Sequence, residues 1–248
     1  MPIPARRHLP TAEPDLEIQI TDDGSRTLVR TDRSDAYHSG CGAIAESRHV
    51  YLQNSGVRDR LADGRATRVL ELGFGTGMNA LMTIDLAVRY HASLRYVALD
   101  LRLPDAETLA GLLPQTWVDD PRLADSFLAW RSASDSSIPE SLCWSPADNV
   151  VLEIRLADFH AFRPDDDAGF DAIYFDPFAP ATDPASWSVE IFARMRQSLA
   201  PEGRLVTYCV SRRVRDACRD AGLDVRRVAG PSGGKREVMI ATATVTSS

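Results

Sequence analysis

Short apolar runs alternate with segments of helical periodicity through the middle and C-terminal parts of the chain. Short apolar runs predict buried strands, whereas apolar positions three and four residues apart predict amphipathic helices. We expect strands at 69–72, 94–100, 150–156, 172–175 and 204–210, and helices at 78–89, 104–113, 184–199 and 211–221. Strands and helices that alternate in this way predict an α/β fold with a doubly wound, mostly parallel sheet.

Both ends of the chain depart from this alternation. The last two apolar runs, 224–228 and 238–244, have no helix between them, which predicts one antiparallel strand near the C-terminus. Near the N-terminus, a turn at Asp22-Asp23-Gly24 between two short apolar runs predicts a hairpin of strands 16–20 and 26–30, and a helical pattern follows at 43–52.

We therefore expect two parts. Residues 1–60 form an N-terminal hairpin and helix extension that packs on the core, and residues 61–248 form the main domain. An irregular insert around 115–149 is rich in proline and serine and carries a helix at 121–130.

Composition places the chain among ordinary globular proteins. Of its 248 residues, 44% are hydrophobic and 25% are charged. The first ten residues lack the apolar centre of a secretion signal, and no apolar run reaches membrane-spanning length. The four cysteines show no metal-ligand spacing, which predicts reduced thiols and no metal site. These features predict a cytoplasmic protein without a membrane partner.

Charge is unevenly distributed along the sequence. The net charge of −7 argues against non-specific adhesion to nucleic acid. Yet the stretch 204–236 holds nine basic residues against three aspartates, a local excess of +6. Arginines suit bidentate phosphate contacts, so the stretch predicts a phosphate-bearing partner. The alternative is a solvated helix surface, which we favour for Arg215 and Arg219.

The segment RVLELGFGTGMNA, residues 68–80, is an apolar strand that breaks into glycines before a helix. Gly73, Gly75 and Gly77 let the backbone turn sharply and approach a ligand closely. A dinucleotide motif has the spacing G-x-G-x-x-G, whereas here the third glycine comes one residue early and Glu71 precedes the first by two. This form resembles the first motif of S-adenosylmethionine-dependent methyltransferases. A glycine-rich turn of another α/β protein is the alternative.

Acidic residues stand at the ends of successive predicted strands, where open α/β sheets bind their ligands. For a donor of this kind, Asp100 is placed to accept hydrogen bonds from ribose hydroxyls and Asp158 from an adenine amino group. Glu71 would meet the amino group of the methionine moiety, directly or through water. One such acid alone is more often a cap or a surface residue, but the recurrence favours a donor site.

The segment YFDPFAPATDPASW, residues 174–187, joins an expected strand end to three prolines, which hold Asp176 at the mouth of the fourth strand. Its D-P-F triad is similar to the D/N-P-P-Y/F motif of amine-directed methyltransferases. There, the carboxylate or amide and the following carbonyl hold the target amine towards the methyl sulfonium. The alternative is a proline-rich loop in which Asp176 or Asp183 caps a helix.

Three separated blocks resemble the methyltransferase domain of the bacterial bifunctional enzymes that make 5-methylaminomethyl-2-thiouridine in tRNA, and their stand-alone relatives. The blocks are DAYHSGCGAIAESRHVYLQNSGV (35–57), ELGFGTGMN (71–79) and FDPFAPATDPASW (175–187), and GKRE (234–237) is similar to the family's G-K-R-E-M ending. They occur in the family's order. Asp183 departs from the family's usual asparagine, and the sequence between 104 and 150 does not align with the family.

The resemblance implies a class I, Rossmann-like methyltransferase that uses S-adenosyl-L-methionine to methylate the aminomethyl group of a tRNA wobble uridine. The donor would be held by Glu71, Gly73, Gly75, Gly77, Asn79, Asp100 and Asp158. Asp176 and Phe178 would act at the target amine and base, and the tRNA side would involve Tyr37, Trp187, Arg212, Lys235 and Arg236.

The chain ends after this domain, so we expect no fused oxidase and an aminomethyl substrate made by separate enzymes. The alternatives are a polyamine aminopropyltransferase, a methyltransferase acting on another amine, and a donor-binding fold kept as an interaction module. The last would expect the glycine loop or Asp176 to be lost, and both are present.

Overall fold

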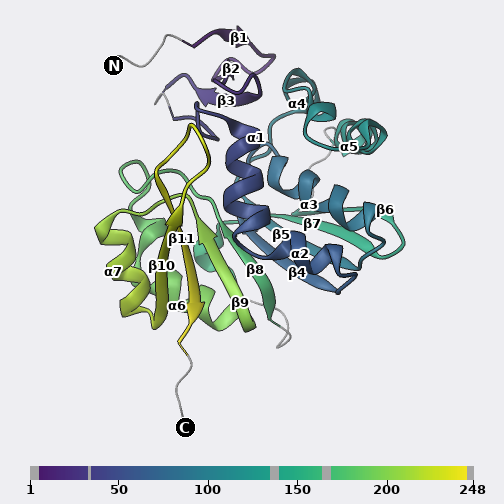
Figure 1. Ribbon diagram of the computed structural model, residues 1–248. Helices are drawn as coiled ribbons and strands as arrows, with labels where there is room; N and C mark the ends of the chain where they lie inside the picture. The colour runs from purple at the N-terminus through teal and green to yellow at the C-terminus, as the bar shows by residue number, and fades with distance from the viewer. Residues whose placement is uncertain (1–5, 33–34, 135–139, 164–168, 245–248) are drawn as a thin grey trace.

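The computed structural model describes residues 6–32, 35–134, 140–163 and 169–244 (Figure 1). Its strands are β1 (His8–Pro10), β2 (Leu16–Ile20), β3 (Arg26–Arg30), β4 (Thr67–Leu72), β5 (Leu94–Asp100), β6 (Ser141–Ala147), β7 (Val150–Leu156), β8 (Phe170–Phe175), β9 (Leu199–Thr207), β10 (Leu223–Ala229) and β11 (Glu237–Ala243). Its helices are α1 (Ala43–Glu46), α2 (Val57–Ala62), α3 (Met78–Arg89), α4 (Ala106–Gly111), α5 (Pro121–Ser134), α6 (Val189–Ser198) and α7 (Arg212–Asp220). Shorter or irregular turns are η1 (Ser47–Gln53), η2 (Pro114–Thr116), η3 (Phe159–Ala161) and η4 (Ala185–Trp187).

An eight-stranded sheet in the order β10-β11-β9-β8-β4-β5-β7-β6 forms the centre of the molecule (Figure 1). Alternate residues of its strands enter two hydrophobic clusters, one on each face. Val69 of β4 packs with η1, α2 and α3, whereas its neighbour Leu70 packs with α6 and α7. The sheet is therefore covered on both sides, as the doubly wound prediction requires.

The direction of winding changes at β4, which comes first in the chain among the strands of this sheet and lies between its two halves. β4 pairs in parallel with β5 on one side and with β8 on the other. The chain returns by α3 on one face and by α6 and α7 on the opposite face. Ligands of open α/β sheets bind at such a switch point, outside the carboxyl ends of the strands.

The predicted antiparallel strand near the C-terminus is β11, which pairs antiparallel with both β9 and β10. A second antiparallel strand, β6, was not predicted and lies at the opposite edge of the sheet against β7. It falls within the insert that we expected to be irregular. Leu142 and Trp144 of β6 are buried while the residues between and beside them are exposed, so a period-two pattern is present but short.

The N-terminal hairpin, β2 with β3, lies at the predicted residues and gains a third strand, β1, that pairs antiparallel with β2. The predicted helix 43–52 is one continuous coil in Figure 1, formed by α1 and by η1, which has the wider π-helical turn. The predicted helix 184–199 begins instead at Val189, because Ser188 caps α6 by accepting a hydrogen bond from the Ile191 N–H. The strand expected at 204–210 runs from Leu199 to Thr207.

Candidate active site

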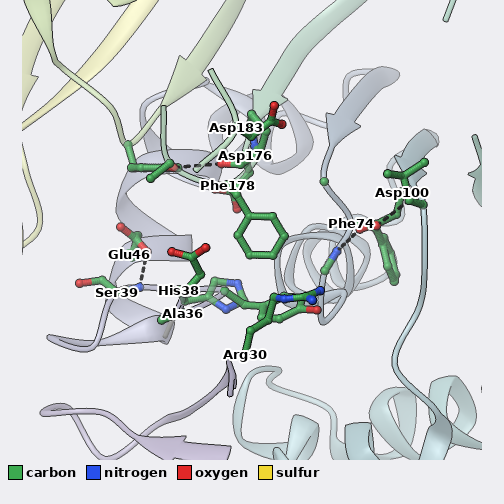
Figure 2. A pocket seen from close by; sticks show the side chains of 18 of the residues that line it. Arg30, Ala36, His38, Ser39, Glu46, Phe74, Asp100, Asp176, Phe178 and Asp183 are labelled. Carbon is green, nitrogen blue, oxygen red and sulfur yellow. Dashed lines mark hydrogen bonds between the residues drawn. The ribbon is translucent and has the colours of Figure 1, made fainter. Parts of the chain in front are cut away.

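A cavity of about 530 Å³ opens at the carboxyl ends of β4, β5 and β8, where the winding changes direction. Its wall combines the glycine loop after β4, the ends of β5 and β8, the segment before α1, and the β10–β11 connection. Of the residues that the sequence predicts for the site, the cavity is lined by Tyr37, Gly73, Gly75, Asp100, Asp176, Phe178 and Lys235. In Figure 2 the Phe178 ring projects into the cavity between Asp100 on one side and Glu46 with Ser39 on the other.

The glycine loop has the backbone that its sequence predicts. Gly73, Gly75 and Gly77 have φ angles of +89°, +55° and +78°, in the left-handed region that favours glycine. A Cβ at Gly73 would lie 2.6 Å from the Asp176 carbonyl oxygen, and one at Gly75 would lie 3.0 Å from the Tyr37 ring. The loop therefore passes close to two other walls of the cavity. Gly77, the N-cap of α3, has no side chain to cap the helix, and the Thr76 hydroxyl accepts from the Met78 N–H at 3.4 Å.

Asp100 is the last residue of β5, and backbone N–H groups hold its carboxylate in place. Its carboxylate accepts hydrogen bonds from the Gly75 N–H at 2.8 Å, the Leu101 N–H at 2.7 Å and the Arg102 N–H at 3.2 Å. Burial raises the pKa of Asp100, and these N–H groups act in the opposite direction. The arrangement joins the glycine loop to the end of β5 and holds the acid at the cavity wall.

Asp176 follows β8 and belongs to a buried chain of hydrogen bonds. Its carboxylate accepts from the Tyr51 hydroxyl and, at 3.3 Å, from the Asn79 amide. The same Asn79 amide donates to Glu71 at 2.9 Å, and Glu71 also accepts from the Tyr96 hydroxyl at 2.8 Å. Side chains from η1 and α3 thus fix the carboxylate that follows β8 at the cavity.

Burial is the main influence on the proton affinity of this carboxylate. Removal from water raises the pKa of Asp176 well above its usual range, and the nearby Glu46 carboxylate raises it further. Tyr51, Lys235 and Asn79 act in the opposite direction. Burial also raises the pKa of Glu71 well above its usual range. Asp176 is consequently a stronger proton acceptor than an exposed aspartate.

Phe178 is positioned by aromatic neighbours and a buried tryptophan. Its ring meets the Tyr37 ring edge-on, with 5.5 Å between the ring centroids. Trp187 is 2% exposed, and its indole N–H donates to the Phe178 carbonyl at 2.9 Å. Trp187 therefore supports the loop from below and does not line the cavity.

Three other predicted donor residues lie off the cavity wall. Glu71 is fully buried beneath it, where its carboxylate accepts from Asn79 and Tyr96, and its contact with an amino group of the donor stays a prediction. Asn79 and Gly77 also lie behind the wall, Gly77 as the N-cap of α3. These residues shape the loop from within.

Asp158 was predicted to reach an adenine amino group, but its neighbour Phe159 lines the cavity instead. The Asp158 carboxylate caps η3, accepting from the His160 N–H at 2.8 Å, and lies 2.6 Å from His160 Nδ1. Asp158 is thus a local cap of η3, and its contact with an adenine amino group stays a prediction.

The basic residues predicted for the substrate side fall into two kinds. Arg212 and Arg236 are exposed at the surface, and Arg212 lies 3.5 Å from Asp216 in an ion pair. Lys235 is also exposed, but it lines the cavity, and its ammonium is 3.0 Å from the Glu46 carboxylate and 3.9 Å from the centre of the Tyr208 ring. The sequence predicted a tRNA contact for Lys235, and the structure gives its charge an internal partner.

Glu46, Tyr51, His38 and Tyr208 belong to the site but were not singled out in the sequence. Glu46, Tyr51 and His38 lie in the block 35–57, and the resemblance of that block to a family was the one sequence feature that could have pointed to them. His38 is buried and burial lowers its pKa to about 4, so it is neutral near neutral pH. Tyr208 donates from its hydroxyl to the Pro177 carbonyl at 2.9 Å and so secures the Asp176–Phe178 segment.

Within the described ranges, no cluster of three or more histidine, cysteine or acidic side chains has the geometry to hold a metal ion. None of the helices in these ranges combines the length and apolar character that crossing a bilayer requires.

Residues 136–244 match the model of a family described as S-adenosyl-L-methionine-dependent methyltransferase. Among curated proteins, the chain is similar to the tRNA 5-methylaminomethyl-2-thiouridine biosynthesis bifunctional protein MnmC of two bacteria. It is 32% identical to that of Pseudomonas paraeruginosa over 227 residues, which are 88% of this chain and 34% of the relative. It is 31% identical to that of Ralstonia nicotianae over 229 residues, which are 90% of this chain and 34% of the relative. The chain thus spans about one third of the length of these relatives.

Among solved structures, the chain is similar to the crystal structure of MnmC2 from Aquifex aeolicus, with a TM-score of 0.71. The match covers 96% of this chain and 74% of that chain, at 21% sequence identity. At this identity the likeness concerns the fold, and it confirms the predicted Rossmann-like arrangement.

Proposed function

We propose that the chain is an S-adenosyl-L-methionine-dependent methyltransferase that methylates the 5-aminomethyl group of a wobble uridine, with or without 2-thiolation, in tRNA. The observation that carries this proposal is that Asp176, Asp100 and the glycine loop line one cavity. An amine-directed acid and a donor-binding loop therefore share the space in which methyl transfer would occur.

The donor end of the cavity is formed by Gly73, Gly75, Asp100 and Phe159. The cavity volume of about 530 Å³ lies in the range of small-molecule sites. The left-handed glycines leave room for a ligand against the backbone, and Asp100 is placed to accept from ribose hydroxyls. When bound, S-adenosyl-L-methionine supplies a methyl group made electrophilic by its sulfonium sulfur.

The amine end is formed around Asp176. An aminomethyl group is mostly an ammonium at neutral pH and has no lone pair, so it must lose a proton before it can accept a methyl group. The Asp176 carboxylate attracts the ammonium and, because its pKa is raised, accepts that proton at lower cost than an exposed aspartate. The neutral nitrogen keeps two N–H bonds, and Asp176, now protonated, holds it through one of them while the lone pair points to the methyl carbon. Formation of the N–CH3 bond would break the S–CH3 bond of the donor, which would leave as the neutral thioether.

Phe178 and Tyr37 supply the other requirement, which is a fixed approach with little water. Their edge-on rings form an apolar wall beside Asp176, suited to contact a pyrimidine base and to exclude water from the amine. Removal of water also favours the neutral amine over the ammonium, and so assists the proton transfer to Asp176.

The test is methyl transfer to tRNA that carries 5-aminomethyl(-2-thio)uridine, followed by nuclease digestion and mass spectrometry of the nucleosides. We expect 5-methylaminomethyl(-2-thio)uridine to appear with S-adenosyl-L-methionine and to be absent with tRNA that lacks the aminomethyl group. Calorimetry should show binding of S-adenosyl-L-methionine and no comparable binding of NAD. Transfer of an aminopropyl group to a polyamine from the decarboxylated donor, without methylation of tRNA, would overturn the proposal.

A further inference from the structure

Lys235 is the only lysine in the sequence, since all other members of the 28 Lys and Arg residues are arginines. It lies on the β10–β11 connection and lines the cavity at the amine end. Its ammonium is 3.0 Å from Glu46 Oε1 and 3.9 Å from the centre of the Tyr208 ring. The charge therefore lies between a carboxylate and an aromatic face at the cavity wall, and the Lys235 side chain is 40% exposed.

Glu46 is a second acid in the same cavity and would by itself attract an ammonium. Its side chain is 6% exposed, and its other oxygen accepts from the Ser39 N–H at 2.7 Å. Lys235 thus neutralises a nearly buried carboxylate whose two oxygens are both engaged. Removal of one partner from such a pair leaves a buried, uncompensated charge.

Asp176 differs from Glu46 in its partners. The Tyr51 hydroxyl and the Asn79 amide, which carry no formal charge, donate to it. Of Glu46 and Asp176, Asp176 is the one whose charge remains for a cationic substrate. Asp35, Asp100 and Asp183 also line the cavity. The distinction decides which carboxylate an incoming ammonium meets.

We propose that Lys235 and Glu46 form a positioning pair that directs the substrate amine to Asp176 by removing Glu46 as a competing acceptor. The inference rests on the proposed function, because it concerns the amine of that reaction. Neither residue forms or breaks a bond in the reaction, and both act through Asp176.

The charged and titratable groups that face Asp176 come from several elements. Glu46 faces it from α1, Tyr51 from η1, Glu71 from β4, Tyr96 from β5, Tyr208 from the segment after β9 and Lys235 from the β10–β11 connection. Asp35 and Asp183 line the same cavity. Glu46 raises the pKa of Asp176 and Lys235 lowers it. Loss of Lys235 alone therefore makes Asp176 harder to ionise. Loss of both Lys235 and Glu46 removes two effects on the pKa of Asp176 that oppose each other.

The test compares Lys235→Met, Glu46→Gln and the double variant in methyl transfer to aminomethyl-uridine tRNA across pH. For Lys235→Met we expect kcat to fall by about tenfold or more and the acid limb of the kcat/KM profile to move to higher pH. In the double variant, the acid limb should return towards that of the wild type, with most of kcat recovered. A merely structural pair would also recover in the double variant, because the uncompensated charge is removed, but its acid limb would stay in place in all three variants.

Arg236→Met is the matched control, because it removes the neighbouring cation from the exposed surface. It should raise the KM for tRNA and leave the acid limb in place. If Lys235→Met behaves like Arg236→Met, Lys235 is an RNA contact and the proposal is overturned. The proposal also fails if the double variant is no better than Lys235→Met. Donor affinity, measured by calorimetry, should be the same in all variants and shows that they are folded.

A second readout does not depend on turnover. Growth with isotope-labelled lysine gives one lysine side-chain signal in NMR spectra, because the sequence has one lysine. We expect that signal to shift strongly in Glu46→Gln and to stay in place in Arg236→Met, and an unshifted signal in Glu46→Gln would overturn the pair. If the lysine signal shifts in Glu46→Gln but the wild-type protein methylates no tRNA, the proposed function is refuted and the pair is not.

Discussion

The Asp176 carboxylate combines burial, two neutral hydrogen-bond donors and an open side at the cavity. Burial raises its pKa, so its ionised form persists only above a pH well beyond that at which an exposed aspartate ionises. Because the amine needs the ionised form, activity should be lost as the pH falls through this raised pKa. The acid limb of the pH–rate profile should therefore report Asp176.

Asp176→Ala should leave donor affinity unchanged and reduce kcat by about 10²-fold or more, the scale of a positioned acid–base group. Asp176→Asn keeps an oxygen acceptor for Tyr51 but cannot accept the proton of the ammonium. If proton transfer dominates, the asparagine variant is as slow as the alanine variant, and if orientation dominates it is faster. Single-turnover kinetics with saturating donor measure the difference. An alanine variant with near-normal turnover would mean that the segment after β8 has only a structural role and that Asp176 takes no part in catalysis.

At the scale of elements, the loop between β4 and α3 depends on glycine for both its backbone and its clearance. Gly75 has a φ of +55°, and a Cβ there would lie 3.0 Å from the Tyr37 ring. Gly75→Val should therefore abolish binding of S-adenosyl-L-methionine, because the branched side chain occupies the cavity wall. Gly64→Val is the control, since Gly64 has a φ of +69° and no atom within 4 Å of its added Cβ. The control should lose stability by backbone strain but keep donor affinity, as calorimetry can show.

The same loop explains why part of the site could be predicted from the sequence. Its chemistry is local: glycines, a strand and a helix adjoin within one segment, and Asp100 and Asp176 follow directly from the ends of their strands. Strand β5 and helix α3 lie at the residues that the apolar pattern predicts. Such features need only short-range rules of backbone and periodicity.

Contacts between segments that are distant in the sequence could not be predicted from these short-range rules. Tyr51 and Asp176 are 125 positions apart, and Glu46 and Lys235 are 189 apart. Their side chains meet only because η1 and the β10–β11 connection cross the same edge of the sheet. Edge strand β6 was missed for a related reason, because its pairing with β7 overrides the weak local preference of a segment with serine and proline.

On the scale of the whole molecule, the arginines of the C-terminal part are distributed over both ends of the sheet. α7 begins at Arg212, five residues after β9 ends, so Arg212 and Arg213 lie at the carboxyl edge with the cavity. β10 runs parallel to β9, because both pair antiparallel with β11. The β10–β11 connection therefore brings exposed Arg236 to the same edge. This edge is where a macromolecular substrate would have to approach.

The last prediction concerns that edge. Binding of tRNA should weaken steeply with salt despite the net charge of −7, because arginine contacts release counterions from phosphates. The double change Arg213→Glu and Arg236→Glu should reduce tRNA affinity and lower the slope of log K against log salt by about 1 to 2, leaving donor affinity unchanged. Arg65→Glu with Arg219→Glu makes the same change of charge at exposed positions before β4 and β10, near the opposite edge of the sheet. If the tRNA binds at the cavity edge, fluorescence anisotropy across a salt series should separate the two pairs. Equal effects would mean that only net charge matters, and a larger effect of the second pair would place the tRNA at the opposite edge.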